Sequence, residues 1–177
     1  MKSHFVQFAA YNHWANRRLL AAVGKLDQEQ RNRPVGLFFG SLHGTLNHLL
    51  VTDRMWLGRL TDVNPEYGPL DKILFENLRE LAPARMAEDE RLISVVNSYK
   101  HDDFDRLVSY RNTSGREFNE SLGAILAHLF NHQTHHRGQV HSGLSIVTGS
   151  EPEALDLVMF QRGLEAPSIE SVIAMCG

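Results

Sequence analysis

Apolar residues recur every three or four positions in four long stretches of the chain, and this spacing is typical of amphipathic helices. The first stretch covers residues 5–26, where spacings of three and four alternate. The second begins after Ser41, a residue type that favours the position before a helix, and continues to Leu60. Asn64-Pro65 and Gly68-Pro69 then mark its end, because both dipeptides are typical of turns.

The third stretch, residues 71–99, has helical spacing but contains Pro83. Because proline has no amide hydrogen, we expect it to break or kink the run into a short helix and a longer one. Residues 107–112 are strand-like, and Asn112-Thr113-Ser114-Gly115 is typical of a turn. This region therefore predicts a small hairpin or an extended loop.

The fourth stretch predicts a helix that Asn119 caps and that ends near Gly149. Between the first two helices, residues 27–40 mix charged residues and turn formers with Phe38-Phe39, which predicts a loop carrying a hydrophobic plug. Residues 151–177 contain two prolines and an apolar run, so we expect a loop or short helix that packs on the body of the protein.

These elements predict an all-α fold, an antiparallel four-helix bundle with a small irregular or hairpin insertion before the last main helix. A chain of 177 residues falls in the usual range for one domain of about 100–200, so we expect a single domain over 1–177. Bundles of this kind commonly hold metal or ligand sites between facing helices.

Charge and cysteine content narrow the classes of partner. The formal net charge of −3 does not imply a strongly basic surface that would bind a nucleic acid, so we expect no nucleic-acid partner. No apolar run reaches the roughly 18 residues of a membrane span, so we expect no membrane segment. A lone cysteine, Cys176, cannot form an internal disulfide, which favours a reducing, cytoplasmic location.

Histidine is the residue type that points to chemistry, because five of the ten histidines lie between 128 and 141. At about 100° per residue, His132 and His136 fall within ~50° of the centre of the apolar stripe. His128 and His135 lie roughly 80–110° from it, and His141 faces nearly away. Two imidazoles at i and i+4 can reach one cation at ~2.0–2.1 Å. The alternative is a hydrogen-bonded pair of buried histidines.

A zinc-protease motif is excluded, because no glutamate follows His132 directly to act as the general base. A bound cation needs at least one more ligand from His13, His43 or His48. Periodicity leaves this choice open. His43 lies roughly 80° from the apolar stripe of its helix and His48 roughly 140°, so the helical wheel mildly favours His43.

Motifs along nearly the whole chain resemble those of the DinB/YfiT-like family of four-helix-bundle metal proteins. The most specific is Asn131-His132-Gln133-Thr134-His135-His136-Arg137-Gly138-Gln139, which resembles the family's Asn-His-x-x-x-His-Arg-Gly-Gln helix. Residues 11–16 resemble its aromatic-Asn-x-Trp-Ala-Asn signature. Further matches are Phe38-Phe39-Gly40-Ser41, Thr45-Leu46-Asn47-His48-Leu49-Leu50, Asp53, Trp56, Arg85, Asp89, Gly149 and Leu155-Asp156.

The resemblance implies that His48, His132 and His136 hold a divalent metal ion, with one to three positions open to water or substrate. Zn, Ni and Fe suit three imidazoles. Some relatives are thiol-dependent transferases or isomerases, so the resemblance implies a metal-dependent enzyme of that type, or a hydrolase, in stress response or detoxification. Its expected partners are a small-molecule substrate, a low-molecular-weight thiol and a second copy in a homodimer.

The roles of four polar residues and the function of the protein stay open at this stage. The polar residues are candidates either for contacts with the ligand imidazoles or for hydrogen bonds between helices, and they are Asp53, Asn131, Arg137 and Gln139. The aromatic residues Tyr11, Trp14 and Trp56 are assigned to the core. The competing function is a non-catalytic dimeric stress-response or binding protein with a structural metal, and a weaker one is a metal-free bundle whose histidines sense pH.

Overall fold

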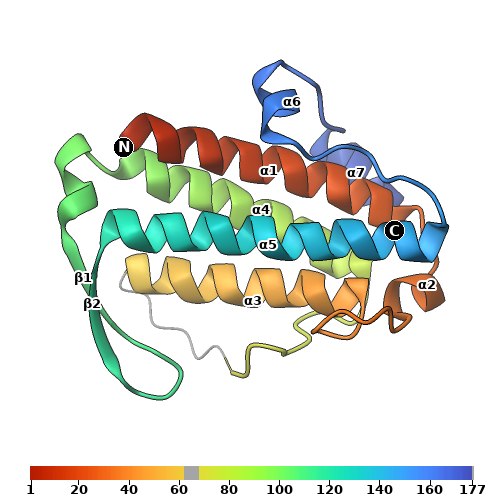
Figure 1. Ribbon diagram of the computed structural model, residues 1–177, viewed down its shortest axis with the longest axis horizontal. Helices are drawn as coiled ribbons and strands as arrows, with labels where there is room; N and C mark the ends of the chain where they lie inside the picture. Colours follow the sequence, from red (N-terminus) through yellow and green to blue (C-terminus); the bar gives the residue numbers. More distant parts are fainter. Residues whose placement is uncertain (62–67, 177) are drawn as a thin grey trace.

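Four long helices lie side by side in the computed structural model, which describes residues 1–61 and 68–176 (Figure 1). They are α1 (Lys2–Gly24), α3 (Leu42–Leu60), α4 (Leu78–Ser98) and α5 (Leu122–Thr148). Helix α1 packs on α4 and α5, and α3 packs on the same two helices. Helices α1 and α5 run in one direction and α3 and α4 in the other, so the pairs α1/α4 and α3/α5 are antiparallel (Figure 1). The all-α four-helix bundle is confirmed.

The interior has two apolar clusters with a polar layer between them. One cluster gathers the C-terminal half of α1 and the N-terminal parts of α3 and α4, and the other gathers their opposite ends. At middle height every long helix contributes buried polar side chains. They are Asn12, Asn16, His48, Asp53, Arg85, Asp89, Gln133, His136 and Arg137. The bundle is therefore held by apolar packing at both ends and by polar contacts at the centre.

Helix α4 corrects one expectation, because it runs unbroken through Pro83. Pro83 is only the sixth residue of the helix, so its missing amide costs a single bond, to the carbonyl of Arg79. The Asn77 side chain caps the start by accepting from the Glu80 amide, at 2.9 Å. Apolar residues on both sides of the proline are buried in the core, and this packing offsets the lost bond. The segment before Asn77 is not helical, so the expected short helix there was wrong.

The predicted hairpin is confirmed. A short helical turn, η1 (His101–Asp105), leads into β1 (Leu107–Arg111), which pairs antiparallel with β2 (Glu117–Ser121). The turn is closed by the Asn112 side chain, which accepts from the backbone amides of Ser114 and Arg116.

The start of α5 differs from the expectation. Asn119 does not cap it, because Asn119 lies in β2 opposite Ser109. The cap is Ser121, whose hydroxyl accepts from the Ala124 amide at 3.2 Å. The end of α5 is as expected, since Gly149 follows it with a φ of +67°, a backbone conformation that favours glycine.

The segment 27–40 contains one short helix, α2 (Gln28–Asn32), before an irregular loop. The expected hydrophobic plug is only half correct, because Phe38 is 85% exposed while Phe39 is half-buried. Phe39 packs on the imidazole of His48. The ring of Phe38 contacts Phe39 edge to face and is exposed to solvent.

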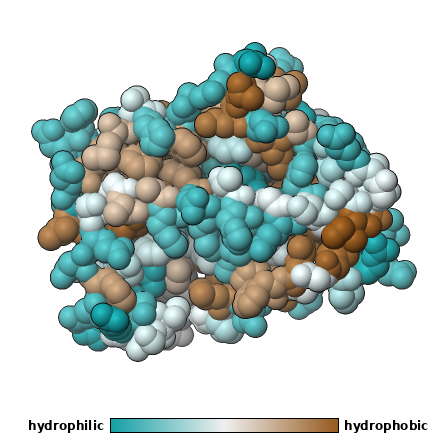
Figure 2. Space-filling model, viewed as in Figure 1, coloured by the Kyte–Doolittle hydropathy of each residue, from teal (hydrophilic) through white to brown (hydrophobic). Residues whose placement is uncertain are grey.

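The C-terminal segment packs against α1 as two short helices, α6 (Leu157–Gln161) and α7 (Ile169–Met175) (Figure 1). Tyr11 and Trp14 are buried beneath it, and Trp56 is buried elsewhere in the core, which confirms their assignment. Hydrophobic and hydrophilic residues are mixed on the surface of the projecting α6 region (Figure 2). Within residues 1–61 and 68–176, no helix is long and apolar enough to cross a membrane.

Candidate metal centre

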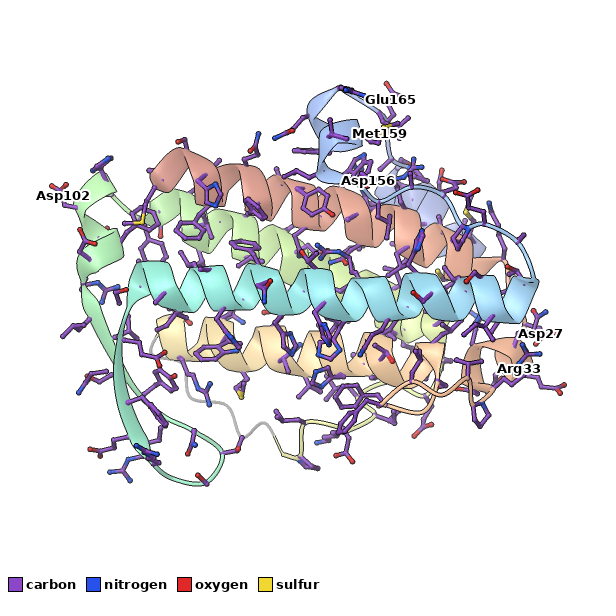
Figure 3. The ribbon with its side chains drawn as sticks, in the orientation of Figure 1. Asp27, Arg33, Asp102, Asp156, Met159 and Glu165 are labelled. Carbon is purple, nitrogen blue, oxygen red and sulfur yellow. The ribbon has the colours of Figure 1, made fainter. Side chains whose placement is uncertain are left out.

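Three histidines from two helices form a cluster between α3 and α5. Side chains fill the space between the ribbons of these two helices (Figure 3). His48 comes from α3, and His132 and His136 come from α5. The Nε2 atoms of His48 and His132 are 3.2 Å apart. The centroid of the His136 ring lies 4.5 Å from the ring centroid of His48 and 4.3 Å from that of His132. One ligand nitrogen from each ring lies within 4.8 Å of the others.

His132 and His136 meet because residues four apart lie on one face of a helix. His48 is nearly fully buried at 3% exposure, although its position on the helical wheel is far from the apolar stripe. Two non-helical segments cover it. The Phe39 ring stacks on the His48 imidazole, with 3.7 Å between the ring centroids. The carbonyl oxygen of Leu70 lies 2.8 Å from Nδ1 of His48. The segments before and after α3 therefore bury His48.

The two other candidates for the third ligand lie outside this cluster. His43 is buried, but its Nε2 lies 2.8 Å from the carbonyl of Phe75 and donates to it. His13 lies on α1, with its Nδ1 3.9 Å from the Asp89 carboxylate. The structure thus brings His48, and not His43, to the inward pair.

Hydrogen bonds fix which nitrogen carries the proton on two of the three rings. The Nδ1–H of His48 donates to the Leu70 carbonyl, and the Nδ1–H of His136 donates to Oε1 of Gln139 at 2.7 Å. The remaining nitrogen of each ring, Nε2, then carries a lone pair. This is the arrangement in which a histidine binds a metal through Nε2.

Burial keeps these imidazoles neutral. Burial is the main cause that lowers the pKa of His48 to about 4 and that of His132 to about 3, and neighbouring histidines contribute to both shifts. The pKa of His136 is also lowered, chiefly by burial. Metal binding requires neutral imidazole, and three such nitrogens fit Zn, Ni or Fe. The residues present therefore fit a divalent cation.

Asn47 is a residue whose role sequence reasoning missed. Its side chain is fully buried, and its Oδ1 accepts from the amides of Leu74 and Phe75 at 2.9 and 3.0 Å. Its Nδ2 donates to the carbonyls of His43 and Phe75. These bonds attach the segment after Leu70 to α3, next to the ligand histidine. Two signals were available in the sequence: an asparagine among apolar residues of a helix, and its place beside His48 in the motif of residues 45–50.

Of the four polar candidates around the site, only Gln139 contacts a cluster histidine in a recorded hydrogen bond. Asn131 is exposed. Asp53 and Arg137 are buried in the polar layer instead. Asp53 pairs with Arg85 at 2.8 Å, and Arg137 bonds to Asn12. The two residues tie helices together.

The Arg85 guanidinium also reaches Asp89, at 2.9 Å, so it lies between two carboxylates. Complete burial raises the pKa of Asp53 to about 6, although Arg85 opposes that shift. Asp89 in turn accepts from Asn12 and Asn16 of α1. The layer thereby connects α1, α3, α4 and α5 at the height of the three histidines.

The other histidines of α5 border the cluster. His128 and His135 are exposed, and their rings lie 6.0 Å from His132 and 4.7 Å from His136 respectively. His141 is turned to the C-terminal segment, where its Nε2 bonds to the carbonyl of Glu153.

The sequence also matches a known protein family. The sequence model of the DinB family matches residues 1–167. The chain is also similar to Protein DinB of Bacillus subtilis (strain 168), with 24% identity over 140 residues, which is 73% of this chain and 78% of that protein. Since the family match spans nearly the whole chain and includes all three histidines, the chain belongs to the DinB family.

Proposed function

We propose that this protein binds one divalent metal ion through His48, His132 and His136 and acts as a metal-dependent enzyme on a small molecule. The observation that carries the proposal is the convergence of three neutral imidazoles from two helices within 4.8 Å. Zn, Ni or Fe bound there would polarise an oxygen or lower the pKa of a bound water or thiol.

The number of protein ligands favours catalysis over a structural role. Structural zinc sites are usually closed by four protein ligands, whereas catalytic sites have three and keep a position open. Among the described residues, three side chains that can bind a metal converge at the site, and all three are histidines. The Phe39 ring covers one side of His48. His128 and His135 lie on α5 beside the cluster, and both are exposed.

The substrate class is part of the proposal. Three neutral ligands leave the bound divalent cation with its full positive charge, which an anionic ligand such as hydroxide or thiolate partly neutralises. Together with the family resemblance, this supports a transferase or isomerase that uses a low-molecular-weight thiol, or a hydrolase. A cytoplasmic homodimer that serves stress response or detoxification completes the proposal.

Metal content measured by mass spectrometry on tag-free protein tests the site. We expect about one ion per chain in the parent protein and none in His132→Ala. His128→Ala is the matched control, because His128 lies one turn earlier on the same helix and outside the cluster. Equal metal content in His132→Ala and the control would overturn the assignment.

A further inference from the structure

Gln139 is the residue on α5 that links a cluster histidine to a neighbouring one. It follows His136 by three positions, so the two side chains share a helix face. Its Oε1 lies 2.7 Å from Nδ1 of His136, and its Nε2 lies 3.3 Å from Nε2 of His135. Each atom of the amide thus faces one ring nitrogen.

The orientation of this amide determines the tautomer of His136. With its oxygen toward His136, the amide accepts the Nδ1–H and leaves a lone pair on Nε2. With the amide reversed, its N–H₂ would face Nδ1, and the ring proton would have to lie on Nε2. That second arrangement blocks the nitrogen that a cation needs.

His48 and His136 differ in the group that accepts their Nδ1–H. His48 donates to a backbone carbonyl, that of Leu70, which no single substitution removes. His136 donates to a side chain, and a neutral imidazole without a partner prefers the proton on Nε2. The tautomer of His136 therefore depends on the residue at position 139.

We propose that Gln139 is a positioning residue that holds His136 in the Nδ1–H tautomer and fixes its ring for metal binding through Nε2. This inference rests on the proposed metal site. Partners of this kind typically change metal affinity by about 10–100-fold when they are removed. The half-buried position of Gln139 on the helix surface makes its substitution compatible with folding.

The test uses three variants of the full chain. Gln139→Leu removes the acceptor at similar size, Gln139→Glu retains an acceptor oxygen, and Gln7→Leu is the matched control at an exposed position of α1. In metal-free protein, ¹⁵N-detected correlations of the histidine rings report the tautomer of His136. Competition with a chromophoric chelator reports the affinity for Zn²⁺.

We expect the parent, Gln139→Glu and Gln7→Leu to show His136 as the Nδ1–H form, and Gln139→Leu to show the Nε2–H form. Gln139→Leu should bind Zn²⁺ about 10–100-fold more weakly, while Gln139→Glu binds at least as tightly as the parent. Rescue by glutamate would show that the loss in Gln139→Leu is not a folding defect.

Unchanged tautomer and affinity in Gln139→Leu would overturn the inference and leave the metal site in place. A parent protein that binds no Zn²⁺ would overturn the proposed function instead, and the tautomer measurement on metal-free protein would still decide the role of Gln139. An Nε2–H tautomer of His136 in the metal-free parent would also overturn the inference.

Discussion

At the scale of single residues, two histidines of α3 show what separates a buried side chain from a metal ligand. His43 and His48 are both almost fully buried, and burial lowers the pKa of both. The Nε2 of His43 is used by the carbonyl of Phe75, whereas the Nε2 of His48 faces His132. The position of the remaining lone pair, more than burial, therefore decides which histidine joins the site.

His43 gives the protein a pH dependence that can be measured apart from the cluster. Its pKa is lowered from 6.5 in the folded state, because burial disfavours the charged ring. As pH falls below 6.5, the unfolded chain binds a proton that the folded chain does not, so the free energy of unfolding decreases. For a full proton the slope is about 1.4 kcal/mol per pH unit.

Denaturant titrations of chelated protein between pH 7.5 and about 5 check this contribution. His43→Gln retains a donor for the Phe75 carbonyl and cannot titrate, so its stability should fall less steeply with acid than that of the parent. Parallel curves for the two proteins would show that His43 makes no such contribution.

Asn47 should be the most costly uncharged substitution near the site. Its amide makes four hydrogen bonds in a fully buried position. Asn47→Ala leaves the amides of Leu74 and Phe75 without their acceptor, so we expect a loss of about 1–3 kcal/mol per orphaned group. Chemical denaturation measures it, and Asn97→Ala, at an exposed position of α4, is the control. A loss within 0.5 kcal/mol, about the effect of an ordinary surface substitution, would contradict the role of Asn47.

At the scale of elements, α3 and α5 approach closely where Gly143 lies. A Cβ at Gly143 would meet the side chain of Leu42 at 2.5 Å and that of Leu37 at 3.2 Å, whereas a Cβ at Gly138 would meet nothing within 4 Å. The space around Gly143 is therefore filled by neighbouring side chains, whereas the space around Gly138 is open.

Alanine at these two positions should have effects of opposite sign on the free energy of unfolding. Gly138→Ala adds helix propensity at an exposed position and should stabilise by about 0.5–1 kcal/mol. Gly143→Ala forces Leu42 away and should destabilise by about 1–3 kcal/mol. Thermal and urea denaturation compare them, and equal effects would contradict the close packing of α3 on α5.

The sequence predicts the four helices well because each buries one apolar stripe, and that periodicity is local. It predicts the inward pair on α5 for the same reason. It cannot place His48 by periodicity, because two segments outside the helix, at Phe39 and Leu70, cover that face of α3. The family resemblance supplied this residue. Pro83 and Asn119 were misjudged because packing and strand pairing override local preference.

At the scale of the whole molecule, the bundle does not depend on the metal for its core. Apolar clusters occupy both ends, and the central layer pairs two carboxylates, Asp53 and Asp89, with Arg85. The site occupies the part of this layer between α3 and α5. A metal there is expected to add binding energy to a fold that already exists.

Chelation should therefore lower Tm and leave the helices intact. At a free metal concentration of 100 times Kd, binding stabilises by about 2.7 kcal/mol, which corresponds to a Tm shift of about 5–11 °C for a chain of this size. Circular dichroism during thermal unfolding, with and without chelator, measures both quantities. Loss of helical signal at 25 °C on chelation would instead indicate a structural metal.

X-ray absorption spectroscopy of the zinc-loaded protein tests the central claim most directly, because it counts and identifies the ligand atoms. We predict three imidazole nitrogens at about 2.0–2.1 Å and at least one further light ligand that added small anions replace. Four imidazoles, a sulfur from the protein, or a ligand set that no added anion changes would contradict an open three-histidine centre.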